Sequence, residues 1–325
     1  NTTADENVFI GQSAGYHNTT GEKNTFVGRK AGQANTTADY NTFIGHKAAQ
    51  SNTTGNENTV VGTSALYYNT TGSSNTAVGY NASLNNNGTN NTSVGQGAMQ
   101  NATAVNKSVA IGVGAMLTHT GTGDEHNVCV GYHAGYNETT GYSNTFVGGL
   151  AGSNITTGSH STFVGKGAGG GATTGGYNIC IGIDAAPSSS GASNECTLGD
   201  SNINNLRCND TSISSLSDRR DKTDIVDLPT GLNFLNTLRP VKFKWATRDG
   251  NVKDGKTRAG FIAQELQEAQ TGSEYLDLVL DSNPDKLEAK QGKLIPVLVK
   301  AVQELSAKND ALAAEVEQLK SQLNN

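Results

Sequence analysis

A serine and a lysine five positions apart are the residues of this chain whose types and spacing best suit covalent chemistry. Ser217 begins and Lys222 ends the charged segment Ser-Asp-Arg-Arg-Asp-Lys. A serine hydroxyl is a weak nucleophile until a neighbouring base takes its proton. A lysine amine serves as that base only when its pKa is lowered, which desolvation achieves. Because no histidine follows His160, this region favours a serine–lysine pair over a serine–histidine pair.

The charged residues between these two have two interpretations. Asp218 and Arg220 are candidates to orient the serine and the lysine, since each could hold a side chain in place by a hydrogen bond. Solvated surface charge is the alternative for both of them, and an ordinary charged turn is the alternative for the whole segment.

The composition predicts a chain without one large hydrophobic core. Its 325 residues include 40 glycines, and only 34% are hydrophobic and 16% charged. Disordered chains are usually rich in charge and proline, whereas this chain has five prolines. Backbone hydrogen bonds are therefore expected to hold most of it together.

An internal repeat accounts for the first two thirds of the sequence. The unit is Asn-x-x-(Ile/Val)-Gly-x-x-Ala, and its copies follow one another at a nearly constant interval of about 17 residues. Such a unit cannot bury its own apolar face, so stacked copies are expected to form a parallel β-solenoid. The repeated glycines are Gly11, Gly28, Gly45, Gly62, Gly79, Gly95, Gly112, Gly131, Gly148, Gly165, Gly182 and Gly199.

The residue type at each position of the unit predicts a structural role. The aliphatic residue before each glycine, from Ile10 to Leu198, is predicted to form a continuous buried ladder. The glycine indicates a positive φ or a tight corner. The asparagine four positions earlier, as at Asn24, suits a left-handed backbone and also a side-chain ladder. Cys129 and Cys180, which stand where other copies have phenylalanine, are expected to be small buried apolar residues.

Beyond the repeats the sequence predicts a small α+β domain and a coiled coil. The domain boundaries are placed at 1–203 (shaft), 204–216 (linker), 217–293 (α+β domain) and 294–325 (helix). Expected elements are helices at 232–238 and 261–269, strands at 241–245 and 276–280, and a turn at Asp249-Gly250. The heptad of the last helix has a positions Ile295, Val302, Asn309, Val316 and Leu323, and d positions Leu298, Leu305, Leu312 and Leu319.

Two resemblances give these patterns a meaning. The segment Asn106–Gly112 resembles the head repeats of trimeric autotransporter adhesins and the repeats of phage tail fibres, whose units are a few residues shorter. This resemblance implies a parallel β-roll built from three chains. The segments Ser217–Ile225, Gly260–Glu265 and Leu298–Leu305 together resemble the self-cleaving intramolecular chaperone domain of phage tail spikes and fibres.

The second resemblance implies a self-cleavage reaction and its position in the chain. It assigns the catalytic pair to Ser217 and Lys222 and the cut to the bond between Leu216 and Ser217. The enzyme is then a single-turnover serine endopeptidase acting on its own chain, without external substrates. The combined prediction is the distal part of a homotrimeric phage tail fibre or spike, assembled in the bacterial cytoplasm and carried on the virion tail.

Partners follow from the same prediction. A host-surface receptor of glycan type is expected, and Asn1 lies so close to the first repeat that a preceding part is expected to join other tail proteins. Bacterial trimeric adhesins and glycan-degrading tail spikes are the alternatives. The candidate receptor contacts are Tyr16, Tyr40, Tyr132, Tyr136, Tyr142 and Tyr177, and filling of turn edges is their alternative role.

Other classes of site find little support. The net charge of −6 gives no footprint for nucleic acid, and no apolar run is long enough to insert into a membrane. No cofactor and no metal are predicted, although His126, Cys129 and His133 form a loose cluster. Asp124 and Glu125 are interpreted as part of a solvated loop.

Overall fold

The structure is a computed structural model that describes residues 4–203, 205–209, 217–246 and 255–323. The chain divides into two compact units, residues 1–203 and residues 204–325. The first is called the shaft below, and the second the C-terminal unit. The predicted Asp249-Gly250 turn and Leu216 lie outside the described residues.

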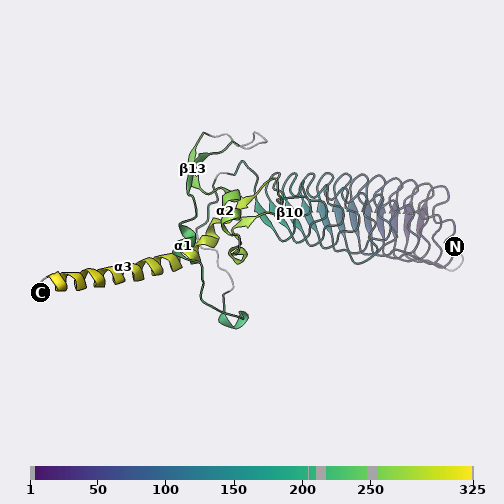
Figure 1. The fold of residues 1–325 in the computed structure, drawn as a ribbon. Helices are drawn as coiled ribbons and strands as arrows, with labels where there is room; N and C mark the ends of the chain where they lie inside the picture. Colours follow the sequence, from purple (N-terminus) through teal and green to yellow (C-terminus); the bar gives the residue numbers. More distant parts are fainter. Residues whose placement is uncertain (1–3, 204, 210–216, 247–254, 324–325) are drawn as a thin grey trace. The chain divides into compact units, whose positions relative to one another are not determined.

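The shaft is a parallel β-solenoid with one strand of three residues in each turn (Figure 1). Each strand pairs with the strands of the neighbouring turns, so that the sheet order equals the chain order from β1 to β12. This confirms the predicted solenoid and its repeat length. The strands are β1 (Val8–Ile10), β2 (Thr25–Val27), β3 (Thr42–Ile44), β4 (Thr59–Val61), β5 (Thr76–Val78), β6 (Thr92–Val94), β7 (Val109–Ile111), β8 (Val128–Val130), β9 (Thr145–Val147), β10 (Thr162–Val164), β11 (Ile179–Ile181) and β12 (Cys196–Leu198).

The middle residue of each strand faces the interior of the shaft. Neighbouring strands pair with like positions opposite one another, as Phe26 with Phe43, and both rings are fully buried. Their ring centroids lie 4.7 Å apart in a stacked arrangement. Cys129 and Cys180 occupy the same column and are buried, which confirms their predicted role as small apolar residues.

The aliphatic residue before each glycine does not form the buried ladder that the sequence predicts. Ile10 is 58% exposed and Ile181 is 45% exposed, and the equivalent residues of the other turns are exposed or half-buried. The reason is the alternation of side chains along a strand, which places neighbours on opposite faces of the sheet. Because the middle residue points inward, the residues on either side of it point outward.

The glycine at each corner permits close stacking of turns. Gly62 has φ +145°, and a Cβ atom at this position would lie 2.3 Å from the carbonyl oxygen of Gly79 in the next turn. The predicted positive φ is therefore confirmed. The asparagine ladder is also confirmed, since the backbone N–H of Asn41 donates to Oδ1 of Asn24 at 2.9 Å. The left-handed backbone falls one residue earlier, at Lys23.

The C-terminal unit is a small α+β structure built around short elements. It contains η1 (Arg219–Asp221), α1 (Leu232–Leu235), β13 (Val241–Lys244), β14 (Thr257–Gly260), α2 (Ala263–Ala269), η2 (Glu274–Leu276), β15 (Val279–Leu280), β16 (Glu288–Ala289), η3 (Gln291–Leu294) and α3 (Ile295–Leu323). The strands form two antiparallel pairs, β13 with β14 and β15 with β16. Both predicted short helices are present but shorter, and the predicted strand at 276–280 is a 3-10 turn followed by two strand residues.

One apolar core joins these elements. It contains Leu266 of α2, Leu278 before β15, Leu294 of η3 and Val297 of α3, all buried. The first turns of α3 therefore belong to the core of the unit. The carboxylate of Glu304, further along α3, accepts a hydrogen bond from the backbone N–H of Leu232 at 2.8 Å and so caps the start of α1.

The rest of α3 extends as a helix with an exposed apolar stripe. The a and d positions that the heptad predicts are exposed in the single chain, among them Val302, Leu305 and Leu312. A long helix with such a stripe is stable in water only when the stripe is covered by another surface. The helix as a whole carries no segment that could cross a bilayer, and the same holds for the other helices within the described ranges.

Candidate catalytic serine–lysine pair

A single turn of 3-10 helix brings the predicted pair together. Asp218 caps η1, since its carboxylate accepts a hydrogen bond from the backbone N–H of Arg220 at 2.9 Å. The turn closes with the N–H of Lys222, which donates to the carbonyl of Arg219. Residues on either side of such a tight turn approach one another, so the chain returns close to Ser217 after five residues.

The two side chains are in direct contact. The Lys222 amine donates a hydrogen bond to the Ser217 hydroxyl, with Nζ and Oγ 2.6 Å apart. Nucleophile and base must lie within hydrogen-bonding distance for proton transfer, and this pair does. Both residues are exposed in the single chain. The contact is thus formed by local structure, and both side chains are exposed among the described residues.

Asp218 and Arg220, predicted as candidates to orient the pair, bind each other instead. The Arg220 guanidinium donates to both carboxylate oxygens of Asp218, with the shortest distance 2.6 Å. This guanidinium, together with the backbone N–H of Arg220, lowers the pKa of Asp218 below its ordinary value. Through the cap on η1, Asp218 shapes the turn rather than contacting either member of the pair.

One known protein family matches the region that contains this pair. Residues 217–275 match the family described as Peptidase S74, the chaperone of endosialidase, and the match begins at the serine of the pair. The C-terminal unit contains a chaperone-of-endosialidase domain. Such a domain after β-solenoid repeats is typical of phage tail fibres and spikes, and the family is one that implies autoproteolytic self-cleavage. Neither a curated protein nor a solved structure matches the chain.

The tyrosines predicted to contact a receptor lie in separate groups on the shaft. Tyr132 and Tyr136 flank the ring of His133, and Tyr142 and Tyr177 flank His160. Tyr132, Tyr142 and Tyr177 are exposed, and Tyr136 is half-buried.

The two remaining tyrosines of the predicted set are also exposed. Tyr40 accepts a hydrogen bond from the Lys23 amine at 3.1 Å, and Tyr16 meets the ring of His17 edge-on. The six tyrosines are therefore not gathered into one site by the contacts that they make.

The loose cluster of His126, Cys129 and His133 is not brought together. Cys129 points into the shaft and is fully buried, whereas His126 is exposed and the half-buried ring of His133 stacks on Tyr132. Within the described parts of the chain, no group of three or more histidine, cysteine, aspartate or glutamate side chains has the arrangement of a metal site.

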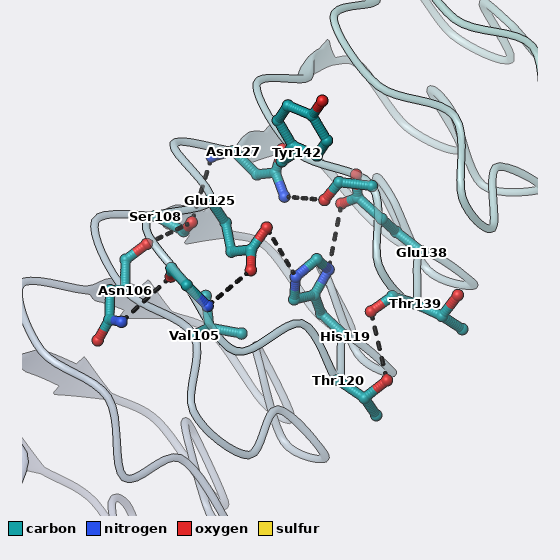
Figure 2. A network of polar contacts seen from close by, with 12 residues as sticks. Val105, Asn106, Ser108, His119, Thr120, Glu125, Asn127, Glu138, Thr139 and Tyr142 are labelled. Carbon is teal, nitrogen blue, oxygen red and sulfur yellow. Dashed lines mark hydrogen bonds and ion pairs between the residues drawn. The ribbon is translucent and has the colours of Figure 1, made fainter.

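The interior of the shaft contains a buried acid–base cluster that the sequence pattern did not predict. His119 is fully buried between Glu125, whose Oε2 lies 3.8 Å from Nε2, and Glu138, whose Oε2 lies 3.9 Å from Nδ1 (Figure 2). The interpretation of Glu125 as part of a solvated loop is wrong, because this side chain is buried. Asp124, its neighbour, does lie at the surface and pairs with Lys107.

The cluster replaces an amide ladder that runs through the earlier turns. In those turns the same interior column holds asparagines, and the amide of Asn35 donates to Oδ1 of Asn18 at 2.7 Å. His119 and Glu138 stand in this column after Ala102. A departure from the repeat at a column position, together with the wider spacing between Gly112 and Gly131, is the sequence signal that could have found the cluster.

Burial moves the proton affinities of this cluster in opposite directions. It raises the pKa of Glu138 to about 8, with the nearby Glu125 carboxylate adding to the effect and the hydrogen bond from Asn144 opposing it. It lowers the pKa of His119 to about 4. Both shifts have the same cause, since loss of water penalises the charged form of either group.

The stability of the shaft is therefore expected to fall as the pH rises from about 6.5 to about 8. A group with a raised folded pKa contributes stability that is lost as the pH rises through that pKa, which is the case for Glu138. The lowered pKa of His119 acts in the opposite sense, but only below about 6.5. Replacing Glu138 by glutamine is expected to remove the decline and to raise the midpoint of thermal unfolding at pH 8.

Circular dichroism at pH 6.5 and pH 8 would measure these midpoints. Glu22→Gln serves as the matched control, because Glu22 is exposed on the same shaft. An equal decline in the wild type and in Glu138→Gln would contradict the assignment of the pH dependence to Glu138.

Proposed function

We propose that this chain is the distal part of a phage tail fibre or spike, whose C-terminal chaperone domain assembles three chains and then cleaves itself off between Leu216 and Ser217. The observation that carries the proposal is the 2.6 Å contact between Lys222 Nζ and Ser217 Oγ at the first residue of the family match.

The proposed reaction uses only groups of this chain and water. A neutral Lys222 amine accepts the proton of the Ser217 hydroxyl, and Oγ attacks the carbonyl carbon of Leu216. The amide bond between Leu216 and Ser217 breaks, an ester to Oγ forms, and the Ser217 nitrogen leaves as an amine that takes up a proton. Water then hydrolyses the ester, which yields the Leu216 carboxylate and restores the Ser217 hydroxyl.

Assembly would control when this reaction takes place. In the single chain both side chains of the pair are exposed, and there the amine donates to the hydroxyl rather than accepting from it. Neighbouring copies that cover the pair would remove water from Lys222 and favour its neutral form. Cleavage would then occur only in assembled chains, and so it would report completed folding.

The exposed heptad stripe of α3 supports assembly of several copies. Leucine or β-branched side chains fill nearly all of its a and d positions, whereas Asn309 at one a position would set the register of the helices. An aligned bundle raises the local concentration of the three shafts during folding. Once the chaperone domain is removed, the template for reassembly is lost and the shaft is trapped kinetically in its folded form.

Attachment to a host glycan is the proposed role of the shaft surface. Its support is the two groups of aromatic rings in contact, Tyr132–His133–Tyr136 and Tyr142–His160–Tyr177. Exposed aromatic faces of this kind suit packing against sugar rings, which present an apolar face with polar edges.

Intact mass spectrometry of the purified chain tests the central proposal. Two products, residues 1–216 and residues 217–325, are the expected result, and light scattering should show that the shaft product remains a trimer. A chain that forms trimers but stays whole would reduce the C-terminal unit to an assembly domain and exclude self-cleavage.

A further inference from the structure

The outward face of the shaft sheet lacks charge along its whole length. Two residues of each strand point outward, and in all twelve strands they are apolar residues, threonine or cysteine. These are the first and last residues of β1 to β12, which run from Val8 and Ile10 to Cys196 and Leu198. Many of the aliphatic members are exposed, namely Val8, Ile10, Ile44, Val61, Ile111, Val147, Val164, Ile179, Ile181 and Leu198.

Charged residues do occur on the other columns of the shaft. Arg29 and Lys166 follow the corner glycines, and Glu6, Lys23 and Glu57 precede the ladder asparagines. The strand columns are thus free of charge although neighbouring columns are not. Depletion of charge distinguishes the buried centre of an interface from ordinary protein surface, and here it accompanies a continuous aliphatic column, the last residue of every strand.

We propose that this face is where copies of the chain pack against one another, with the turns in parallel alignment around a common axis. The inference rests on the trimer of the proposed function and assigns the surface that holds its shafts together. The face of one chain would be covered by the equivalent faces of the other two.

The length and period of the face favour another copy as its occupant. Twelve strands stacked about 4.8 Å apart extend over roughly 55 Å, and three residues span about 10 Å. The face therefore offers on the order of 550 Å² in total to its two neighbours, compared with the about 800 Å² that each partner buries in a standard two-body interface. A partner must repeat its apolar side chains at the same spacing over this length, and a second shaft does so by construction.

The C-terminal unit supplies an independent requirement for copies of the chain. The heptad stripe of α3 is exposed at Val302, Leu305 and Leu312, and it too needs helices of the same kind to cover it. A parallel helix bundle holds its chains in the same direction. Because the copies are identical, equivalent turns of each shaft precede the bundle by the same number of residues, which is compatible with the alignment that the sheet face requires.

Cysteine accessibility in the assembled protein tests the inference. In a full chain carrying Cys196→Ser and Cys208→Ser, which removes the exposed thiols, Ile44→Cys is compared with Thr37→Cys. Both positions are exposed in the single chain, but Ile44 lies on the sheet face and Thr37 in a turn on another column. Reaction with a maleimide is expected to be at least about tenfold slower at position 44 in the oligomer, and equally fast at both positions after unfolding.

Light scattering and intact mass on the same samples separate this inference from the proposed function. Equal labelling at both positions in an intact trimer would overturn the assigned face while leaving the trimer in place. A folded monomer would overturn both, whatever the state of the bond at 216–217. Rapid labelling of the pure trimer at position 44 that stops only when host envelope is added would assign the face to a receptor and overturn the inference.

Discussion

A chain in which Ser217 is replaced by alanine is expected to remain one polypeptide, while the wild type separates into residues 1–216 and residues 217–325. Alanine removes the only group that the proposed mechanism uses to attack the Leu216 carbonyl. This hydroxyl lies 2.6 Å from the Lys222 amine, which is the proposed base. We expect the rate of cleavage to fall by at least about 10³-fold, as intact mass after timed incubation would measure.

Variants of Lys222 and Arg219 distinguish loss of the proposed base from loss of a positive charge in the same turn. Lys222→Met and Lys222→Arg are both expected to stop cleavage, because methionine cannot accept a proton and arginine stays charged in proteins. Arg219→Met is the matched control, since it removes an exposed positive charge from the same turn. Normal cleavage in Lys222→Met, or its loss in Arg219→Met with trimers intact, would contradict the serine–lysine mechanism.

Replacing Gly62 by alanine is expected to cause a large loss of stability in the shaft. The backbone at Gly62 has φ +145°, and the added Cβ would lie 2.3 Å from the carbonyl oxygen of Gly79. That carbonyl belongs to the backbone of the next turn and cannot move without disturbing the stack. Backbone strain and overpacking together are expected to cost about 3 kcal/mol or more. Unfolding in guanidinium chloride, followed by circular dichroism, would measure the loss.

Gly149→Ala provides the control within the same shaft. Gly149 does not have a positive φ, and the nearest atom to an added Cβ is the Tyr132 carbonyl oxygen at 4.0 Å. Its free energy of unfolding is expected to change by less than about 0.5 kcal/mol. A similar loss for both glycines would show that the shaft tolerates alanine at its corners no worse than at its surface.

The period of the shaft and the conformation of its corners could be predicted from the sequence. Glycines that recur at a nearly constant interval leave few ways to stack a chain, and only glycine readily adopts the φ that Gly62 and its equivalents require. The contact between Ser217 and Lys222 is also local, because the two residues are joined by a short turn whose closure depends on nearby residues. Features that depend only on residues close together in the sequence can be predicted from the sequence.

The cluster around His119 could not be predicted in this way. Glu125 follows an aspartate in a long spacer, which is the usual composition of a solvated loop. Its burial depends on how the longer spacer of this turn folds back over the interior column that holds His119 and Glu138. The burial of Glu125 therefore depends on residues of neighbouring turns, and the sequence of its own spacer does not reveal it.

Only the tertiary structure shows which side chains of each strand point into the shaft. In a strand such as Thr25–Val27 both the phenylalanine and the valine are apolar, so the pattern marks the strand but not its inner side. Repeat spacing, corner glycines and the serine–lysine pair follow from residue types at short range. Which apolar column is buried follows from packing, because the middle residue of each strand, a phenylalanine in several turns, points into the shaft and leaves the adjoining valines and isoleucines on the outer face, open to other copies of the chain.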